Sequence, residues 1–183
     1  MLAGNEAFIP NSYESIATLT GTGSNTSVTF SSIPSTYKHL QVRAIARGNS
    51  GGNTNDTFNI RLNSDTGTNY SQHLLQGNGS TVVATGGASV NYLRFMVNTS
   101  GDSSAANIMG TAIFDLIDYA DTSKYKTSRS FYGVDQNTAG VNFVGLASGV
   151  WMSTSAVNSI TVYNPFSDTM SASTTFALYG IKG

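Results

Sequence analysis

The chain of 183 residues contains no cysteine, only two histidines and only three prolines. The absence of cysteine excludes disulfides, thiolate metal sites and cysteine nucleophiles together. No apolar run approaches the roughly 20 residues that a membrane-spanning helix needs. The first fifteen residues lack the cationic segment and apolar run of a secretion signal, so we expect the protein to be made in a cytoplasm.

Charged residues are scarce as well. They make up 10% of the chain, with 9 Lys and Arg against 10 Asp and Glu, whereas about 25% is usual. Ser, Thr, Asn and Gly replace them and solvate the surface without creating an electric field. The net charge of −1 gives no attraction to nucleic acid or to an anionic membrane, and we expect neither as a partner.

What the sequence does contain is a repeated alternation of apolar and polar residues. In segment 57–63, Phe58, Ile60 and Leu62 alternate with polar neighbours, which is typical of a strand with one buried face. The same period occurs at 16–20, 28–33, 40–46, 93–97, 108–117, 127–134, 141–151, 160–162 and 176–178. There is no 3.6-residue apolar stripe of a helix. The pattern predicts an all-β fold, an antiparallel two-sheet sandwich of about ten strands, jelly-roll-like as the first choice.

Glycine and asparagine gather between these segments, at 21–25, 48–53, 77–79 and 86–87. Both residues tolerate the positive φ of tight turns, so we expect a turn at each place. None of these segments has the Gly-Lys-Ser/Thr ending of a phosphate-binding loop, and none precedes a predicted helix.

The domain organisation follows from the same pattern. Residues 15–183 are predicted to form a single β-sandwich domain, because no linker, repeat or shift in composition divides them. Residues 1–14 lack the alternation and are assigned to an N-terminal arm. Phe8, Ile9, Pro10 and Tyr13 would make the contacts of this arm with a neighbouring subunit, and a frayed terminus is the alternative interpretation.

The two histidines, His39 and His73, give little support to catalysis. A Ser-His-Asp site needs a serine and an acid that converge on a histidine, and no Gly-x-Ser-x-Gly elbow marks a nucleophile. We expect His39 to open a strand and His73 to lie on a polar face or an edge. The sequence therefore predicts a protein that is not an enzyme, with no catalytic residue and no cofactor.

The acidic residues give an equally weak signal for a metal. Asp115, Asp118 and Asp121 are the densest group, but their spacing of three does not place them on one strand face. Segment 65–69, with Asp65 at its start and Asn69 at its end, has a hint of a calcium loop, yet it lacks a bidentate acid. We expect solvated turns and no metal. A small glycoside hydrolase or lyase would need two of these acids paired in a cleft, and is a distant alternative.

Aromatic residues could stack on a sugar if they were exposed. At strand spacing most of them belong in the core. The set considered is Tyr92, Phe95, Phe114, Phe131, Tyr132, Phe143, Trp151 and Tyr163. Trp151 is the best candidate among them for an exposed aromatic contact.

Four segments resemble small virion proteins of tailed bacteriophages, including cyanophages and marine phages. They are Phe-Ser-Ser-Ile-Pro-Ser-Thr-Tyr-Lys-His-Leu at 30–40, Arg-Leu-Asn-Ser-Asp-Thr-Gly-Thr-Asn-Tyr at 61–70, Tyr-Lys-Thr at 125–127, and Thr-Phe-Ala-Leu-Tyr-Gly-Ile-Lys at 175–182. Capsid decoration or cement proteins look closest. The Gly- and Asn-rich residues 48–56 fit the resemblance only as a variable loop.

The resemblance implies a non-enzymatic structural protein of the virion, made in the host cytoplasm. It would bind the outside of the head and clamp neighbouring capsid subunits, with the major capsid protein and copies of itself, as a homotrimer, for partners. It implies no catalytic residue. The alternative function is a tail-fibre, baseplate or receptor-binding domain that contacts host glycans, through Trp151 or exposed tyrosines.

Overall fold

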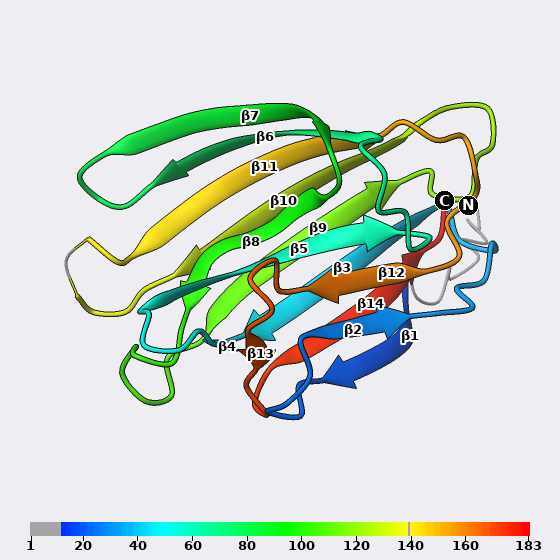
Figure 1. Cartoon of the computed structure of the whole chain (residues 1–183). Helices are drawn as coiled ribbons and strands as arrows, with labels where there is room; N and C mark the ends of the chain where they lie inside the picture. The colour runs from blue at the N-terminus through cyan, green and yellow to red at the C-terminus, as the bar shows by residue number, and fades with distance from the viewer. Residues whose placement is uncertain (1–11, 139) are drawn as a thin grey trace, which may run out of the picture.

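The computed structural model describes residues 12–138 and 140–183, and in that part of the chain it contains strands, turns and loops but no helix (Figure 1). Eight strands form one sheet, in the spatial order β1 (Tyr13–Thr20), β14 (Thr175–Ile181), β3 (His39–Ala46), β9 (Gly110–Ile117), β10 (Lys126–Val134), β11 (Phe143–Trp151), β6 (Tyr70–Gly77) and β7 (Val82–Val90). Four form a second sheet, β2 (Ser27–Phe30), β12 (Ile160–Tyr163), β5 (Asn55–Leu62) and β8 (Leu93–Ser100). A small third pair consists of β13 (Thr169–Met170) and β4 (Gly48–Asn49).

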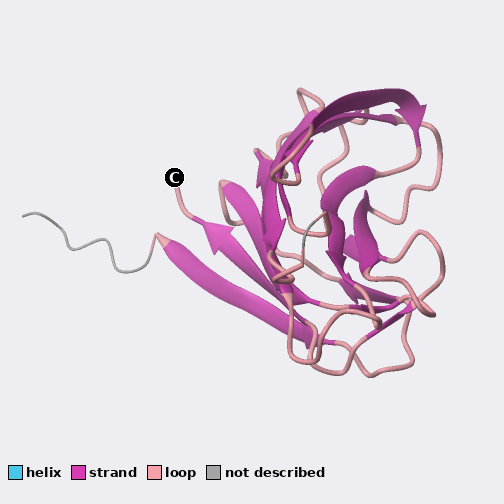
Figure 2. Ribbon diagram, turned by 90° about the vertical axis from the view of Figure 1, so that its left-hand side faces the viewer, coloured by secondary structure: helices cyan, strands magenta, loops and turns pink. Residues whose placement is uncertain are grey.

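The two main sheets lie face to face as two layers. The four-stranded sheet covers the middle of the large sheet in Figure 1, and Figure 2 shows the large sheet curving around it. Every pairing between the named strands is antiparallel. The predicted all-β, antiparallel sandwich is therefore confirmed. The strands divide eight, four and two, so the jelly-roll arrangement gains no specific support from this topology.

The alternation along each central strand decides which side chains enter the core. In β10, Ser128, Ser130 and Tyr132 are buried, while Arg129 and Phe131 between them are exposed. Successive side chains of a strand point to opposite faces of the sheet, so the period of two gives one covered and one open face.

Aromatic rings join the two layers. Phe95 of the small sheet meets Phe114 of the large sheet edge to face, with ring centroids 5.9 Å apart, and Phe58 meets Phe176 in the same way at 5.9 Å. All four rings are buried. Edge-to-face pairs of this kind add about 0.5–1.5 kcal/mol each beyond the burial of their area.

No helix long and apolar enough to cross a membrane occurs between residues 12 and 138 or between 140 and 183.

The sequence pattern predicted about ten strands, whereas the described residues form fourteen, so four strands were missed. Two of them, β4 and β13, have only two residues each; the others are the neighbours β6 and β7.

The turn predicted at 86–87 is wrong, because both glycines lie within β7. Gly86 is opposite His73, and a Cβ there would come within 2.6 Å of His73 Cδ2, so the glycine makes room for the imidazole. The turn predicted at 77–79 does connect β6 to β7.

The boundary predicted after residue 14 falls inside β1. Tyr13 and Glu14, which we assigned to the arm, pair with Ile181 and Gly180 of β14. The other predicted contact residues of the arm, Phe8, Ile9 and Pro10, lie outside the described residues.

The close approach of Tyr37 to Gly180 gives a test of the packing at this end of the sheet. A Cβ at Gly180 would overlap the first ring carbons of Tyr37. We expect Gly180→Ala to lower the free energy of unfolding by about 1–3 kcal/mol, measured by urea denaturation, because these atoms cannot swing away freely. Gly77→Ala is the matched control, since its Cβ would only touch a backbone oxygen of Thr81 at 3.7 Å. Equal midpoints for the two variants would contradict this account.

Candidate docking surface on the large sheet

The large sheet has one face that the small sheet does not cover, which we call the outer face. Across its central strands the register places apolar side chains in a continuous row. Ile113 of β9 is opposite Phe131 of β10, Phe131 is opposite Leu146 of β11, and Leu146 is opposite Leu75 of β6. Residues directly opposite each other on neighbouring strands lie on the same face, so this row is one surface feature.

Two more apolar residues widen the row into what we call the apolar band. Its members, each between 40% and 54% exposed, are Ile45, Leu75, Ile113, Phe131, Val144 and Leu146. A single exposed apolar side chain is ordinary in a soluble protein. Six that are contiguous on one sheet face are typical of an interaction site.

Phe131 stands between two hollows in this face. One has a volume of about 400 Å³ and lies toward β3 and β14, with Ile45 and Tyr179 on its wall. The other, of about 320 Å³, lies toward β6 and β7, with Leu75 and Val82 on its wall. Both hollows have mostly apolar walls, so an apolar side chain of a partner on either side of the Phe131 ring would lose water from its surface.

A polar row runs beside the apolar band, and its side chains contact one another within the chain. Gln41 Nε2 donates to Asp115 Oδ1 at 2.8 Å, and Arg129 Nε lies 2.8 Å from Asp115 Oδ2. Arg43 Nε donates to Gln41 Oε1 at 2.8 Å, while its guanidinium lies over the rings of Tyr13 and Tyr179. The outer face thus combines an apolar centre with a polar border, as protein–protein interfaces do.

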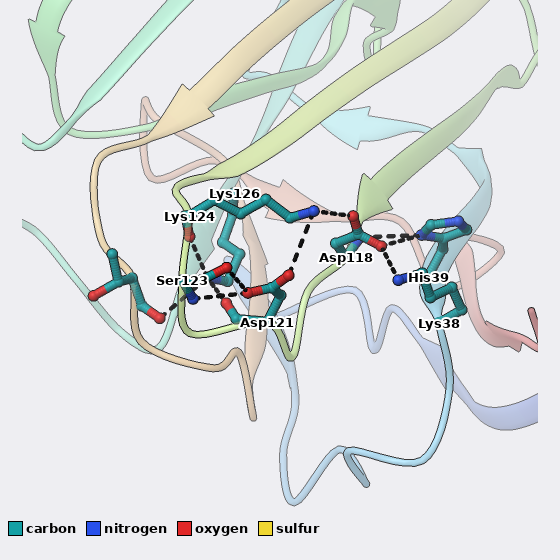
Figure 3. A network of polar contacts seen from close by, with 8 residues as sticks. Lys38, His39, Asp118, Asp121, Ser123, Lys124 and Lys126 are labelled. Carbon is teal, nitrogen blue, oxygen red and sulfur yellow. Dashed lines mark hydrogen bonds and ion pairs between the residues drawn. The ribbon is translucent and has the colours of Figure 1, made fainter.

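A charged cluster lies where β9 ends and the chain turns toward β10 (Figure 3). The Asp118 carboxylate makes ion pairs with Lys124 and, at 3.0 Å, with Lys38, and these two contacts hold the pKa of Asp118 below its ordinary value. The backbone N–H of Asp118 donates to His39 Nδ1 at 3.0 Å. The imidazole Nδ1 therefore accepts a hydrogen bond from the main chain. A general base needs a free lone pair to take a proton, and the lone pair of this nitrogen is already used.

Lys126 is the buried member of this region. It is fully buried, and its Nζ donates to the carbonyl oxygens of Asp121 at 2.5 Å, Lys124 at 2.9 Å and Thr154 at 3.2 Å (Figure 3). Burial lowers the pKa of this amine. Because the ammonium ties the β9–β10 connection to the loop after β11, we interpret the cluster as structural.

This interpretation predicts the effect of Lys126→Met. Methionine would fill the space but leave three inward-facing carbonyl groups without their donor, so we expect a loss of about 2–4 kcal/mol in unfolding free energy. Lys124→Met is the control, because the Lys124 side chain is 52% exposed and its ion pairs are partly solvated. Thermal or urea unfolding of both variants measures the difference, and a Lys126→Met protein as stable as the wild type would show the interpretation to be wrong.

The predicted exposed contact at Trp151 is wrong. Trp151 is only 3% exposed, stacks on Tyr70 with ring centroids 6.2 Å apart, and donates from Nε1 to Asp65 Oδ2 at 2.7 Å. Asp65 also accepts from Gly67 N at 2.8 Å and Asn69 Nδ2 at 3.0 Å. The segment considered as a calcium loop, between β5 and β6, therefore uses its aspartate to hold the indole in place.

The other sequence candidates do not converge. His39 on β3 and His73 on β6 are separated by three strands, which puts them four strand spacings or roughly 19 Å apart. Asp115 belongs to the polar row of the outer face, whereas Asp118 and Asp121 lie in the β9–β10 connection. No group of three or more His, Cys, Asp or Glu residues that could hold a metal ion occurs in the described part of the chain.

One acid, Asp56, is buried on the far side of the sandwich from the outer face. It is 3% exposed, its Oδ1 accepts from Thr57 N at 2.6 Å and Asn164 Nδ2 at 2.5 Å, and its Oδ2 is buried without a hydrogen-bond partner. Burial raises the pKa of Asp56 from 3.8 to about 6, and the charge of Asp168 adds to this.

The raised pKa of Asp56 predicts that the unfolding free energy of the protein depends on pH. Because the folded protein holds this proton more tightly than the unfolded chain, the stabilisation is fully present below a pH of about 4 and is lost as the pH rises through about 6. The variant Asp56→Asn keeps the side-chain oxygen that accepts from Thr57 and Asn164, but its amide cannot gain or lose a proton in this range. The unfolding free energy of the wild type relative to Asp56→Asn should fall by roughly 1–3 kcal/mol between about pH 4 and pH 7. Urea denaturation across this range tests it, and parallel pH profiles would contradict it.

The apolar band was not predicted from the sequence. Phe131 appeared only among aromatics assigned mostly to the core, and Leu75 and Leu146 were not singled out. In β10 the missing signal was the charged Arg129, which shares its face with Phe131. Serine gives no such signal, because Ser148 of β11 is exposed on the outer face whereas Ser128 and Ser130 of β10 are buried on the inner face.

Comparison with known proteins assigns no family. No protein-family description matches the chain, and no curated protein matches it. Among solved structures, Scytalido-glutamic peptidase with a peptide-based transition-state analogue aligns at a TM-score of 0.30 and 8% identity, over 90% of this chain and 66% of that one. The exoplasmic/lumenal domain of VIP36 with Ca²⁺ and Man3GlcNAc aligns at 0.26 and 8%, over 82% and 84%. Likeness at this level gives no basis for assigning a function.

Proposed function

We propose that this chain is a non-enzymatic structural protein of a tailed-phage virion, which decorates the outside of the head by docking its outer face onto subunits of the major capsid protein. The observation that carries the proposal is the apolar band, since it is contiguous, exposed and bordered by a polar row in which Arg129 and Asp115 form an ion pair. The resemblance of four segments to small phage virion proteins supports the choice of partner.

The physical properties of the outer face suit attachment to a shell. The apolar band supplies the free energy of contact, at about 25 cal/mol for each Å² removed from water. The ion pair between Arg129 and Asp115 means that neither of these two charges enters the contact without a partner. Repetition of the contact over a symmetric shell turns a modest affinity for one site into stable coverage through avidity.

The alternative, a domain that binds host glycans, loses its main candidate because Trp151 is buried. Phe131 is an exposed aromatic, but its neighbours in the row are aliphatic and not the polar groups that fix the hydroxyls of a sugar. The geometry therefore favours a protein partner for this face.

The test is the attachment of purified protein to capsids of the encoding phage that lack it. We expect Phe131→Asp to weaken attachment by about 10- to 100-fold, because a carboxylate at the centre of the apolar band would lose its water on docking. Phe166→Asp is the matched control: Phe166 is 71% exposed, in the loop after β12 on the side of the small sheet. Cosedimentation with capsids measures occupancy for the wild type and both variants.

Each outcome has a definite meaning. Wild-type protein that leaves capsids bare, but binds a glycan array or host cells, would favour the alternative function. Equal loss with Phe131→Asp and Phe166→Asp, or no loss with Phe131→Asp, would overturn the assignment of the outer face as the docking surface.

A further inference from the structure

The strand β7 forms one edge of the large sheet, and no described strand pairs with its other side (Figure 1). Its only partner in the sheet is β6. All nine of its residues are exposed or partly exposed, with Val82 74% and Val83 44% exposed. An edge strand presents alternate N–H and C=O groups outward, so it is a template for a further strand.

The sequence of β7 contains none of the features that usually block such an edge. The strand reads Val-Val-Ala-Thr-Gly-Gly-Ala-Ser-Val and has no charged residue and no proline. The opposite edge, β1, differs: it carries Glu14, paired with Lys182 at 3.0 Å, and its register is broken by a bulge between Ser15 and Ala17. Charges and bulges protect edges from pairing with other chains. β1 has both kinds of protection, whereas β7 has no charged residue and departs from regular register only beyond Gly87.

The open edge is also regular where it is most apolar. From Val82 to Gly87 the strand keeps an unbroken register with β6, and the irregularity lies beyond, where Ser89 has a positive φ of 53°. Six consecutive residues of extended, unprotected backbone are therefore available. A strand of that length matches the usual strand length in sheets.

We propose that β7 pairs antiparallel with β7 of a second copy of this chain, around a two-fold axis perpendicular to the sheet at Ala84. Such an axis places residues of the same face opposite each other, so Val82 would lie opposite Gly86 of the other copy and Val83 opposite Thr85. The large side chains at one end of the segment meet small ones at the other. A strand without charges pairs with itself without placing like charges side by side.

A second observation supports a copy of the same chain as the occupant. Leu75 of the apolar band is opposite Ala84, and Val82 lines one of the two hollows beside Phe131. Pairing at β7 would therefore join the apolar bands of two copies into one surface across the two-fold axis. The contact stands on β7 alone, however, and does not depend on what the outer face binds.

The proposal replaces the homotrimer that the resemblance implied. A two-fold contact relates two copies and cannot by itself close a ring of three. Sedimentation equilibrium of the purified full-length protein separates the two outcomes, since we expect twice the chain mass of 19.2 kDa. A monomer or a trimer at the concentrations used would overturn the proposal.

The absence of cysteine makes the contact directly testable by cross-linking. In an antiparallel pair, directly opposite Cα atoms are about 4.5–5.5 Å apart, within the range that a disulfide spans. We expect Ala84→Cys to form a disulfide-linked dimer under mild oxidation. Thr18→Cys, at an exposed position of β1, is the control and should stay unlinked. Equal cross-linking of both variants would mean random collision and would count against the contact.

A charge variant completes the test. Ala84→Lys would place two ammonium groups opposite each other and should weaken dimerisation at least about tenfold. The position is exposed, and a circular dichroism spectrum like that of the wild type verifies folding. Phe131→Asp should remain dimeric. If Phe131→Asp separates the copies and Ala84→Lys does not, the dimer uses the outer face and the β7 contact is wrong, while the capsid experiment remains a separate test.

Discussion

The register of the central strands is the constraint on which the rest of the structure depends. β9, β10 and β11 pair residue for residue without a bulge. A slip of one residue would turn Phe114, Tyr132 and Trp151 toward water and the apolar band toward the core. The inner face admits little variation, because glycines and serines of β10 and β11 make room for the rings and side chains that pack on them. Gly145, for example, lies against Tyr132, and Gly149 lies against Leu93.

The same constraint gives a structural role to several polar side chains of this protein. Ser130, on the inner face of β10, donates to the backbone oxygen of Phe95 at 2.7 Å and so ties the two sheets together. Lys126 and Asp65 act similarly at one end of the sandwich, the first on carbonyl groups and the second on the indole of Trp151. Each of these three side chains holds a neighbour in a fixed position.

The two faces and the two edges of the large sheet differ in a consistent way. One face is covered by the small sheet and the other presents the apolar band; one edge is protected by Glu14 and a bulge, and the other is open. Low charge makes this possible, since an outer face with many lysines and glutamates would resist desolvation. We infer that the molecule is built to be covered on one face and extended at one edge, as expected for a subunit of an assembly.

The sequence by itself determined the fold class, because a period of two in apolar residues has only one structural meaning over so many segments. It could not assign faces where both sides of a strand carry apolar residues. In β11, small residues point inward and Val144 and Leu146 point outward, so hydrophobicity alone does not tell which side of this strand is buried. Trp151 was misplaced and Gly86 was taken for a turn for a related reason: each depends on a partner distant in the sequence, Asp65 and His73. Only the tertiary structure decided which apolar residues stay in water and which edge remains open, because both are set by what packs against a strand and not by the strand itself.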